Sequence, residues 1–314
     1  MINWGYAVNQ WRNLEVDLVR KDQMESAFKV ISVCGFNGIE ITDTAIGTHD
    51  YVAGLYGSVR NFMNFLNDCG IERVCSFFYG YYWGSPLNPA DHGMLAAEAG
   101  RYAEAAAQLG ASRFVARPMG PYFKNAPITD DKIKTVGECW SKVGEATKAA
   151  GLATSLHSDF LCGIRNEADI DKLLAWSDSA TVGFTLDTAE LTIAGIDVVK
   201  FYEKYHDRID HLHFKDAVTT DELDEYKDLN AEIEYWPQHL CAAGAKRGIE
   251  RWYYEMGTPG GLVDFPALTQ ALGAHGYDGW VVVESDQSPH VEESVMLNGW
   301  YLKKVLLSEA THVR

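Results

Sequence analysis

The 314-residue sequence is short of positive charge. Its 27 lysine and arginine residues are outnumbered by 44 aspartate and glutamate residues, which gives a formal net charge of −17 at pH 7. Nucleic acid and anionic membrane surfaces would be repelled over most of such a protein, so we expect neither as a partner. A neutral ligand or a cation is easier to accommodate, although an acidic surface also serves solubility alone.

The sequence also lacks closely spaced cysteines, a signal peptide and a long apolar run. Its six cysteines include no C-x-x-C pair, and a chain of this length does not need disulfides for stability. The N-terminal residues lack the basic start and apolar stretch of a secretory signal, and no apolar segment approaches the length of a membrane span. We therefore expect a cytoplasmic protein with free, buried thiols at Cys34, Cys69, Cys75, Cys139, Cys162 and Cys241.

No linker or low-complexity stretch interrupts the chain, and a strand-then-helix unit recurs along it. Short apolar runs predict strands at residues 3–8, 38–42, 73–78 and 113–116, and at four segments that end at residues 157, 187, 213 and 284. Helical spacing of apolar residues predicts helices at 24–33, 59–69, 95–109, 131–150, 168–176, 198–205, 231–245, 266–274 and 291–307.

About eight such units predict a single (β/α)8 TIM barrel domain spanning residues 1–314, with a C-terminal helix. The apolar run at 252–256 would be one strand too many, so we assign it to the last connection. A doubly wound open sheet is the main alternative, but no G-x-G-x-x-G follows the first strand to support it.

The last four predicted strands end in residues that bind metals or move protons: His157, Asp187, His213 and Glu284. Side chains alternate along a strand, and the active sites of such barrels lie at the carboxyl ends of the strands, so these four are predicted to converge inside the barrel mouth. Two imidazoles and two carboxylates suit a divalent metal, with Mn²⁺ preferred and Co²⁺, Zn²⁺ or Mg²⁺ as alternatives. Taken singly, a buried histidine is usually only hydrogen-bonded, and an aspartate often caps the next helix. The four matching positions together favour the metal.

Further polar residues follow the same strand ends. Asp159, Glu190 and His211 could orient the ligands, although each could equally be an ordinary polar loop residue. Lys215 can reach a substrate oxygen, but a lysine at a strand end is also commonly a solvated charge. Two charged residues lie at other strand ends: Glu40 and Arg117. Arg117 is a candidate for substrate binding.

Aromatic residues at two other strand ends are candidates for binding a sugar. The first strand leads into Trp11 and Arg12, and the third leads into the aromatic loop 77–83, which contains Tyr82 and Trp83. Trp and Tyr combine apolar area with a hydrogen-bonding tip, which suits the apolar faces and hydroxyls of a sugar ring. A hydrophobic lid or a subunit contact is the alternative for the same loop.

These residues resemble a known family, the xylose isomerase-like TIM barrels, also called the sugar phosphate isomerase/epimerase superfamily. Segments 186–189, 211–216 and 283–284 resemble its metal-binding strand ends. Segments 4–7 with 11–13, 263–266 and 276–280 are similar to its inosose dehydratase branch. The resemblance implies an enzyme that removes a proton next to the carbonyl of a keto-sugar or keto-cyclitol, with Glu284 as both metal ligand and base.

One position departs from the epimerases of this family. They usually carry a glutamate at the end of the fifth strand, where it binds metal and acts as one of two opposed acid/bases. Here the position is His157, as in the dehydratase branch, and the second proton-transfer group would be His157, Asp159 or Glu190. We therefore expect β-elimination, by a lyase like inosose dehydratase or like the α-subunit of a C-glycoside deglycosidase, which works with a small β-subunit.

Two alternatives stay open: a sugar isomerase or 3-epimerase of the same superfamily, and a sugar-binding barrel that has lost its chemistry. Ligand candidates at all four strand ends argue against the second. In each case the partner is a small keto-sugar or cyclitol, and we expect the chain to form a homo-oligomer.

Overall fold

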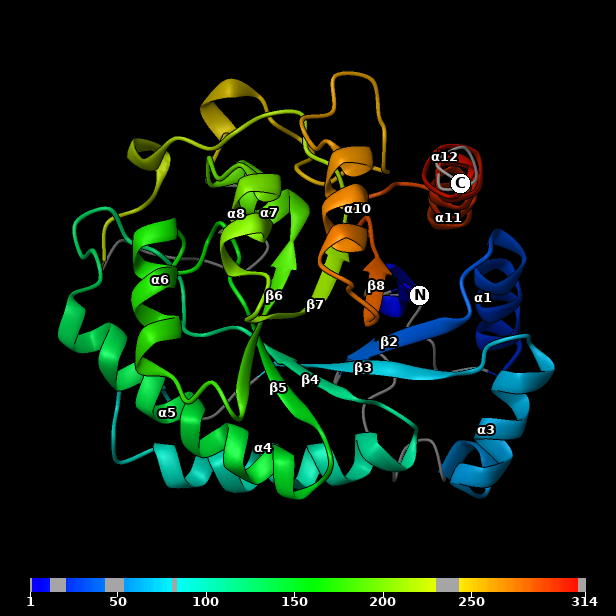
Figure 1. The fold of residues 1–314 in the computed structure, drawn as a ribbon, viewed down its shortest axis with the longest axis horizontal. Helices are drawn as coiled ribbons and strands as arrows, with labels where there is room; N and C mark the ends of the chain where they lie inside the picture. Colours follow the sequence, from blue (N-terminus) through cyan, green and yellow to red (C-terminus); the bar gives the residue numbers. More distant parts are fainter. Residues whose placement is uncertain (1, 12–20, 43–53, 81–83, 230–242, 310–314) are drawn as a thin grey trace.

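The structure, a computed structural model, describes residues 2–11, 21–42, 54–80, 84–229 and 243–309. Eight parallel strands follow one another around a closed barrel in the order of the chain, and β1 pairs with β8 to close it. The helices between them surround the strands (Figure 1). The predicted (β/α)8 barrel with a C-terminal helix is therefore confirmed.

The strands are β1 (Asn3–Ala7), β2 (Gly38–Thr42), β3 (Arg73–Tyr79), β4 (Arg113–Ala116), β5 (Ala153–His157), β6 (Val182–Asp187), β7 (Ile209–Phe214) and β8 (Trp280–Val283). The described helices are α1 (Lys21–Cys34), α3 (Val59–Asp68), α4 (His92–Gln108), α5 (Asp130–Ala149), α6 (Glu167–Trp176), α7 (Thr188–Ile193), α8 (Val198–Tyr205), α10 (Phe265–Ala274) and α11 (Val291–Tyr301), which continues through a π-helical turn (Leu302–Leu306) into α12 (Leu307–Glu309). Short 3₁₀ turns lie at Val8–Trp11, Leu223–Glu225 and Ala245–Arg247.

The strand ends agree with the predicted ones to within one residue. The run at 252–256 contributes only an isolated bridge between Asp216 and Tyr254, so its assignment to the last connection is confirmed. The six-residue helix α7 is absent from the prediction, because it begins directly after β6 and is too short to show a helical repeat. The helix predicted at 231–245 lies almost entirely outside the described residues.

Alternation along β8 shows how the strands divide their side chains. Val282 packs with Ala7 and Cys75, which come from β1 and β3, in a small cluster inside the barrel. Val281 and Val283 belong to the large apolar layer between the strands and the helices. Period-two alternation therefore sends one set of side chains inward and the other onto the helices, as expected for a barrel.

Two register shifts bring polar residues of neighbouring strands level with one another. A shift between Ile39 and Glu40 sets Glu40 of β2 opposite Ser76 of β3. A second shift, immediately before Thr185 in β6, sets Asp187 opposite His213 of β7. Such irregularities re-aim side chains in barrels and are common next to active sites. Both of these pairs lie in or beside the candidate metal centre.

The five cysteines that the structure describes are buried and free, as predicted, and Cys241 lies outside the described residues. None of the helices in the described ranges is long and apolar enough to cross a membrane.

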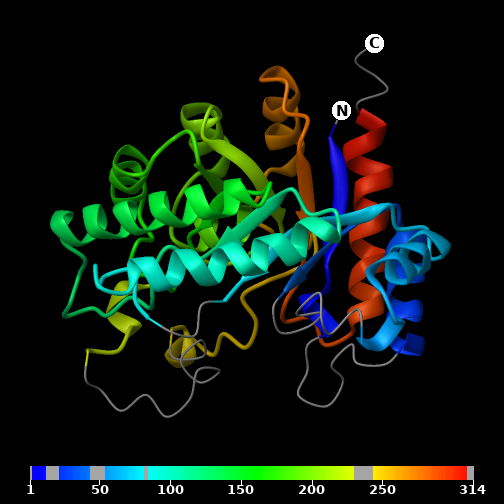
Figure 2. The ribbon, with the colours of Figure 1, turned by 90° about the horizontal axis from the view of Figure 1, so that it is seen from below.

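The C-terminal helix α11 packs against α1 on the outside of the barrel (Figure 2). Gly299 makes this contact close, because a Cβ atom at that position would lie only 2.5 Å from the carbonyl oxygen of Cys34 and 2.7 Å from its Cβ. Only glycine fits there without moving one helix.

We predict that Gly299→Ala destabilises the protein by about 1–3 kcal/mol, the usual cost of forcing a methyl group into a packed contact. The urea midpoint of unfolding would fall accordingly. Gly273→Ala in α10 is the matched control, since a Cβ there meets nothing within 4 Å. This control should leave the urea midpoint unchanged or raise it. The corresponding gain in the free energy of unfolding would be at most about 1 kcal/mol. Equal midpoints for Gly299→Ala and the wild type would contradict the close packing.

Candidate metal centre

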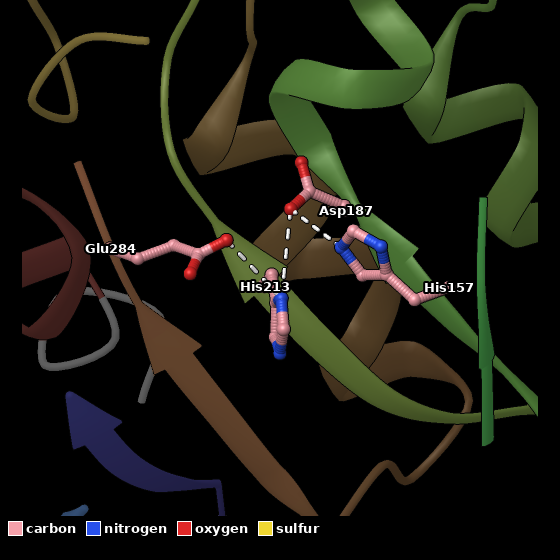
Figure 3. A group of neighbouring side chains, drawn as sticks. All are labelled: His157, Asp187, His213 and Glu284. Atoms are coloured by element: carbon pink, nitrogen blue, oxygen red, sulfur yellow. Dashed lines mark hydrogen bonds and ion pairs between the residues drawn. The ribbon is translucent and has the colours of Figure 1, made fainter. Parts of the chain in front are cut away.

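Four side chains from consecutive strand ends converge in the barrel mouth: His157, Asp187, His213 and Glu284 (Figure 3). One nitrogen or oxygen atom from each lies within 4.8 Å of the others. His157 Nε2 is 3.1 Å from Asp187 Oδ2, and His213 Nδ1 is 3.6 Å from the same oxygen and 3.3 Å from Glu284 Oε1. The structure thus brings together all four residues that the sequence singled out.

Local backbone structure explains this convergence. The register shift in β6 sets Asp187 level with His213, and the backbone N–H of Glu284 donates to the carbonyl of Phe214, which holds Glu284 to the barrel one residue beyond β8. Asp187 is also the N-cap of α7, where its Oδ1 accepts from the backbone N–H of Glu190 at 2.9 Å. The two oxygens of Asp187 therefore have separate partners. Oδ1 caps the helix, and Oδ2 faces the metal centre.

The donor set fits a divalent ion. All four residues are at most 3% exposed, and Nδ1 of His213 faces the carboxylates of both Asp187 and Glu284. Two imidazole nitrogens and two carboxylate oxygens form a mixed set that suits Mn²⁺, Co²⁺ or Zn²⁺. An ion bound by all four would lie between His213 Nδ1 and these two carboxylates.

Lys215 contacts both carboxylates of this group and is 2% exposed, so it is not a solvated surface charge. Its Nζ is 2.9 Å from Asp187 Oδ2, 3.2 Å from Asp286 Oδ2 and 3.6 Å from Glu190 Oε1, and it also donates to Glu284 Oε1. Burial opposes the charge of Lys215, but these carboxylates outweigh burial and hold its pKa well above the usual range. Lys215 is thus a permanent cation between several carboxylates.

Asp159 lies behind His157. His157 Nδ1 is 2.7 Å from Asp159 Oδ1, and the other oxygen of Asp159 pairs with Nε of Arg117. Burial opposes protonation of His157, but its hydrogen bonds to Asp159 and Asp187 outweigh that effect and raise the pKa of His157 to about 9. The ring of Phe78 packs edge-on against His157, with ring centroids 5.3 Å apart. His157 is therefore fixed from three sides.

Glu190 is a buried carboxyl group with two hydrogen-bond donors. The hydroxyl of Tyr253 donates to its Oε1 at 2.8 Å, and the backbone N–H of Phe160 donates to its Oε2 at 2.9 Å. Burial, followed by the negative charge of Asp159, raises the pKa of Glu190 to about 8. In the metal-free protein Glu190 is thus largely protonated at neutral pH and can give a proton away.

Two residues near the centre were not among the predicted site residues. Tyr253 belongs to the connection before α10, and its ring lies 4.5 Å from Lys215 Nζ. Asn9 follows β1 and donates to Glu284 Oε2 at 3.0 Å and to Asp286 Oδ1 at 2.5 Å. An aromatic run in a loop and an asparagine after a strand are too common to identify these roles from the sequence.

The remaining candidates are only partly accounted for. Trp11 is buried, with its ring edge-on to Tyr6 at 6.3 Å between centroids, so it takes part in the core. His211 binds Glu40 rather than any of the four ligand candidates directly. Three predicted substrate contacts lie outside the described residues: Arg12, Tyr82 and Trp83.

Comparison with known proteins identifies the family of this barrel. A family model described as a xylose isomerase-like TIM barrel matches residues 28–300. The chain belongs to this family. An inosose dehydratase of Lacticaseibacillus casei is 31% identical over 164 residues, which cover 52% of this chain and 50% of that protein, so this match spans about half of the relative's length. An inosose dehydratase of Bacillus licheniformis is 26% identical over 318 residues, which cover 98% of this chain and 97% of that protein.

Solved structures of other proteins share the fold. A sugar phosphate isomerase/epimerase from Parabacteroides distasonis superposes with a TM-score of 0.68 at 18% identity, covering 97% of this chain and 94% of the other. An L-ribulose 3-epimerase superposes with a TM-score of 0.71 at 16% identity, covering 100% and 97%. At these identities the likeness shows the barrel and does not distinguish one activity from another.

For this xylose isomerase-like barrel we predict about one tightly bound divalent ion per chain, lost when a ligand is removed. Loss of a residue that only supports a metal ligand weakens metal binding by roughly 10–100-fold. His213→Ala and Glu284→Gln remove ligands themselves, so each should weaken Mn²⁺ binding by more than that. Elemental analysis and competition with a chelator measure this. His275→Ala, in a histidine that pairs with Glu203 away from the centre, is the control and should bind as the wild type does. Wild-type metal content in both ligand variants would refute the assignment.

The affinity for the ion should also rise with pH. A histidine must be neutral to bind metal, whereas the raised pKa of His157, about 9, leaves it protonated in the metal-free protein at pH 7. Binding must therefore release that proton, so the apparent affinity should increase between pH 7 and about pH 9. Titrations with a chelator at each pH measure this, and a constant affinity over that interval would contradict it.

Proposed function

We propose that this protein is a divalent-metal-dependent lyase that acts on a keto-sugar or keto-cyclitol. It would remove a proton next to the carbonyl and expel a β-substituent. The observation that carries the proposal is the histidine at the end of β5: His157 lies between Asp159 and Asp187, so this position presents a ring nitrogen to the centre in place of a carboxylate. Relatives named inosose dehydratase support the same substrate class and reaction.

The ion, which we propose to be Mn²⁺, would be held by His157, Asp187, His213 and Glu284. When bound, it supplies a Lewis acid that polarises the substrate carbonyl. Lys215 is placed to donate a hydrogen bond to a substrate oxygen, because its charged Nζ lies among the carboxylates at the mouth and it cannot act as a base while its pKa is so high.

Glu284 is the proposed base. Its Oε1 faces His213 and Lys215, and its Oε2 accepts from Asn9, so both oxygens are fixed in direction. Glu284 would take the proton from the carbon next to the carbonyl. The electron pair of that C–H bond becomes the new C=C bond as the β C–O bond breaks.

Glu190 is the proposed acid. Its Oε1 lies 3.6 Å from Lys215 Nζ, which also contacts Glu284, and Tyr253 and the backbone of Phe160 fix its orientation. Its proton would go to the departing hydroxyl, which leaves as water. Asp159, by contrast, is engaged with His157 and Arg117, so we assign it to holding His157 rather than to proton transfer.

A 3-epimerase is the second candidate, and one observation favours it. Glu190 and Glu284 both contact Lys215, so the site has two carboxyl groups despite the histidine in β5. Glu190 could return a proton to the opposite face of the same carbon. If the leaving group were instead an aglycone, the chain would act as a C-glycoside deglycosidase α-subunit does, with a small β-subunit.

We predict that an inosose or a 3-keto-glucoside, incubated with the Mn²⁺-loaded protein, develops the ultraviolet absorbance of an enone. Removal of the proton donor in Glu190→Gln should slow this reaction by about 10²–10⁴-fold, the usual contribution of a general acid, without loss of bound metal. Glu292→Gln is the control, since Glu292 is an exposed residue in the first turn of α11.

The same reaction in D₂O separates the two candidates. Elimination gives the enone and water. An epimer that carries deuterium at one carbon, without enone absorbance, would reject the lyase and select the epimerase. Substrate binding that survives in metal-free protein and in Asp187→Ala, with no turnover of any keto-sugar, would instead indicate a barrel that only binds sugars.

A further inference from the structure

Glu40 is a buried carboxylate beneath the metal centre that the proposed reaction does not use. It lies on β2 and is 1% exposed. One of its oxygens, Oε2, is the common acceptor of three groups: Nε2 of His213 at 3.1 Å, Nε2 of His211 at 3.2 Å and the hydroxyl of Ser76 at 2.7 Å. The register shift in β2 sets Glu40 opposite Ser76 and so makes this arrangement possible.

We propose that Glu40 is a positioning residue that keeps the ring proton of His213 on Nε2 and so leaves Nδ1 free for the divalent ion. This inference rests on the proposed metal site. A neutral imidazole carries one proton, and the hydrogen bond made by one nitrogen decides which nitrogen has the free lone pair. With Nε2–H donated to Glu40, the lone pair of His213 is on Nδ1, which faces Asp187 and Glu284.

The surroundings of His213 differ on its two sides. On the Nε2 side there is a single carboxylate oxygen, already supplied with three donors. On the Nδ1 side there are two carboxylates, Asp187 at 3.6 Å and Glu284 at 3.3 Å, and both are proposed ligands of the ion. A carboxylate that accepts the second N–H of a ligating histidine orients the ring and makes it a stronger ligand. The asymmetry therefore assigns Nε2 to Glu40 and Nδ1 to the ion.

The same residues could in principle hold an ion of their own, because Glu40, His211 and His213 also form a close group. The hydrogen bond from Ser76 argues against this. It directs an O–H donor at the oxygen that such an ion would need, and the three donors already satisfy that oxygen. We therefore treat Glu40 as an acceptor.

His211 provides the matched control. It presents Nε2 to the same oxygen of Glu40 and is as deeply buried as His213, but none of the described ion pairs involves its Nδ1. Its replacement disturbs Glu40 without removing a ligand. A general loss of packing under the centre would affect both histidines alike, whereas the proposal concerns only His213.

The test compares Glu40→Leu, which removes the acceptor, with Glu40→Gln, whose amide oxygen can still accept from His213. Mn²⁺ affinity is measured by competition with a chelator, and ring-nitrogen NMR of Zn²⁺-loaded, ¹⁵N-histidine-labelled protein reports which nitrogen carries the proton. Glu40→Leu should lose about 10–100-fold in affinity and lose the Nε2–H signal of His213. Glu40→Gln and the control His211→Asn should retain both. Glu40→Asp, which withdraws the carboxylate by one methylene, takes the place of Glu40→Leu if the latter does not fold, with the same expected loss.

Two results would overturn the inference while the metal site stands: wild-type affinity with an unchanged His213 signal in Glu40→Leu, or two ions per wild-type chain falling to one in Glu40→Leu, which would make Glu40 a ligand. A wild-type chain that binds no divalent ion at all would refute the proposed function, on which the inference depends. The metal content of the wild type thus separates the two failures.

Discussion

Buried carboxylates need positive charge beside them, and the mouth of this barrel depends on that requirement. An unpaired carboxylate in such a place costs roughly several kcal/mol. Lys215 and His157 each face more than one acid. Lys215 contacts Asp187, Glu190 and Glu284; His157 contacts Asp159 and Asp187. The site is therefore a network of ion pairs in which charged groups share partners. A divalent ion would bind within this network. Five acidic side chains of this network are buried: Glu40, Asp159, Asp187, Glu190 and Glu284.

Much of the barrel could be predicted from the sequence because the relevant physics is local. Alternation along a strand and the shared direction of parallel strands suffice to bring His157, Asp187, His213 and Glu284 to one place, whatever the details of the loops. The same argument fails where a strand departs from regular register. The shifts that set Glu40 opposite Ser76 and Asp187 opposite His213 have no signature in the residues themselves.

The supporting contacts were beyond sequence reasoning for a different reason. Tyr253 meets Glu190 across 63 residues of chain, and Asn9 meets Glu284 across 275. Such pairings depend on the path by which long loops return to the barrel. A single tyrosine or asparagine in the sequence does not indicate which residue it will contact. Lys215 could be placed at the right strand end, but the choice between a solvated and a buried cation required its neighbours, because burial is a property of the whole fold.

The N-cap made by Asp187 has a consequence for how the site tolerates movement. The backbone N–H that Asp187 accepts belongs to Glu190, so a proposed ligand and the proposed acid are joined within a single turn of chain. Their separation is set by short-range backbone geometry rather than by packing between distant elements. Opening of the surrounding loops to admit a substrate would leave that spacing unchanged. Asp187 and Glu190 would keep their relative position while other residues of the site adjust.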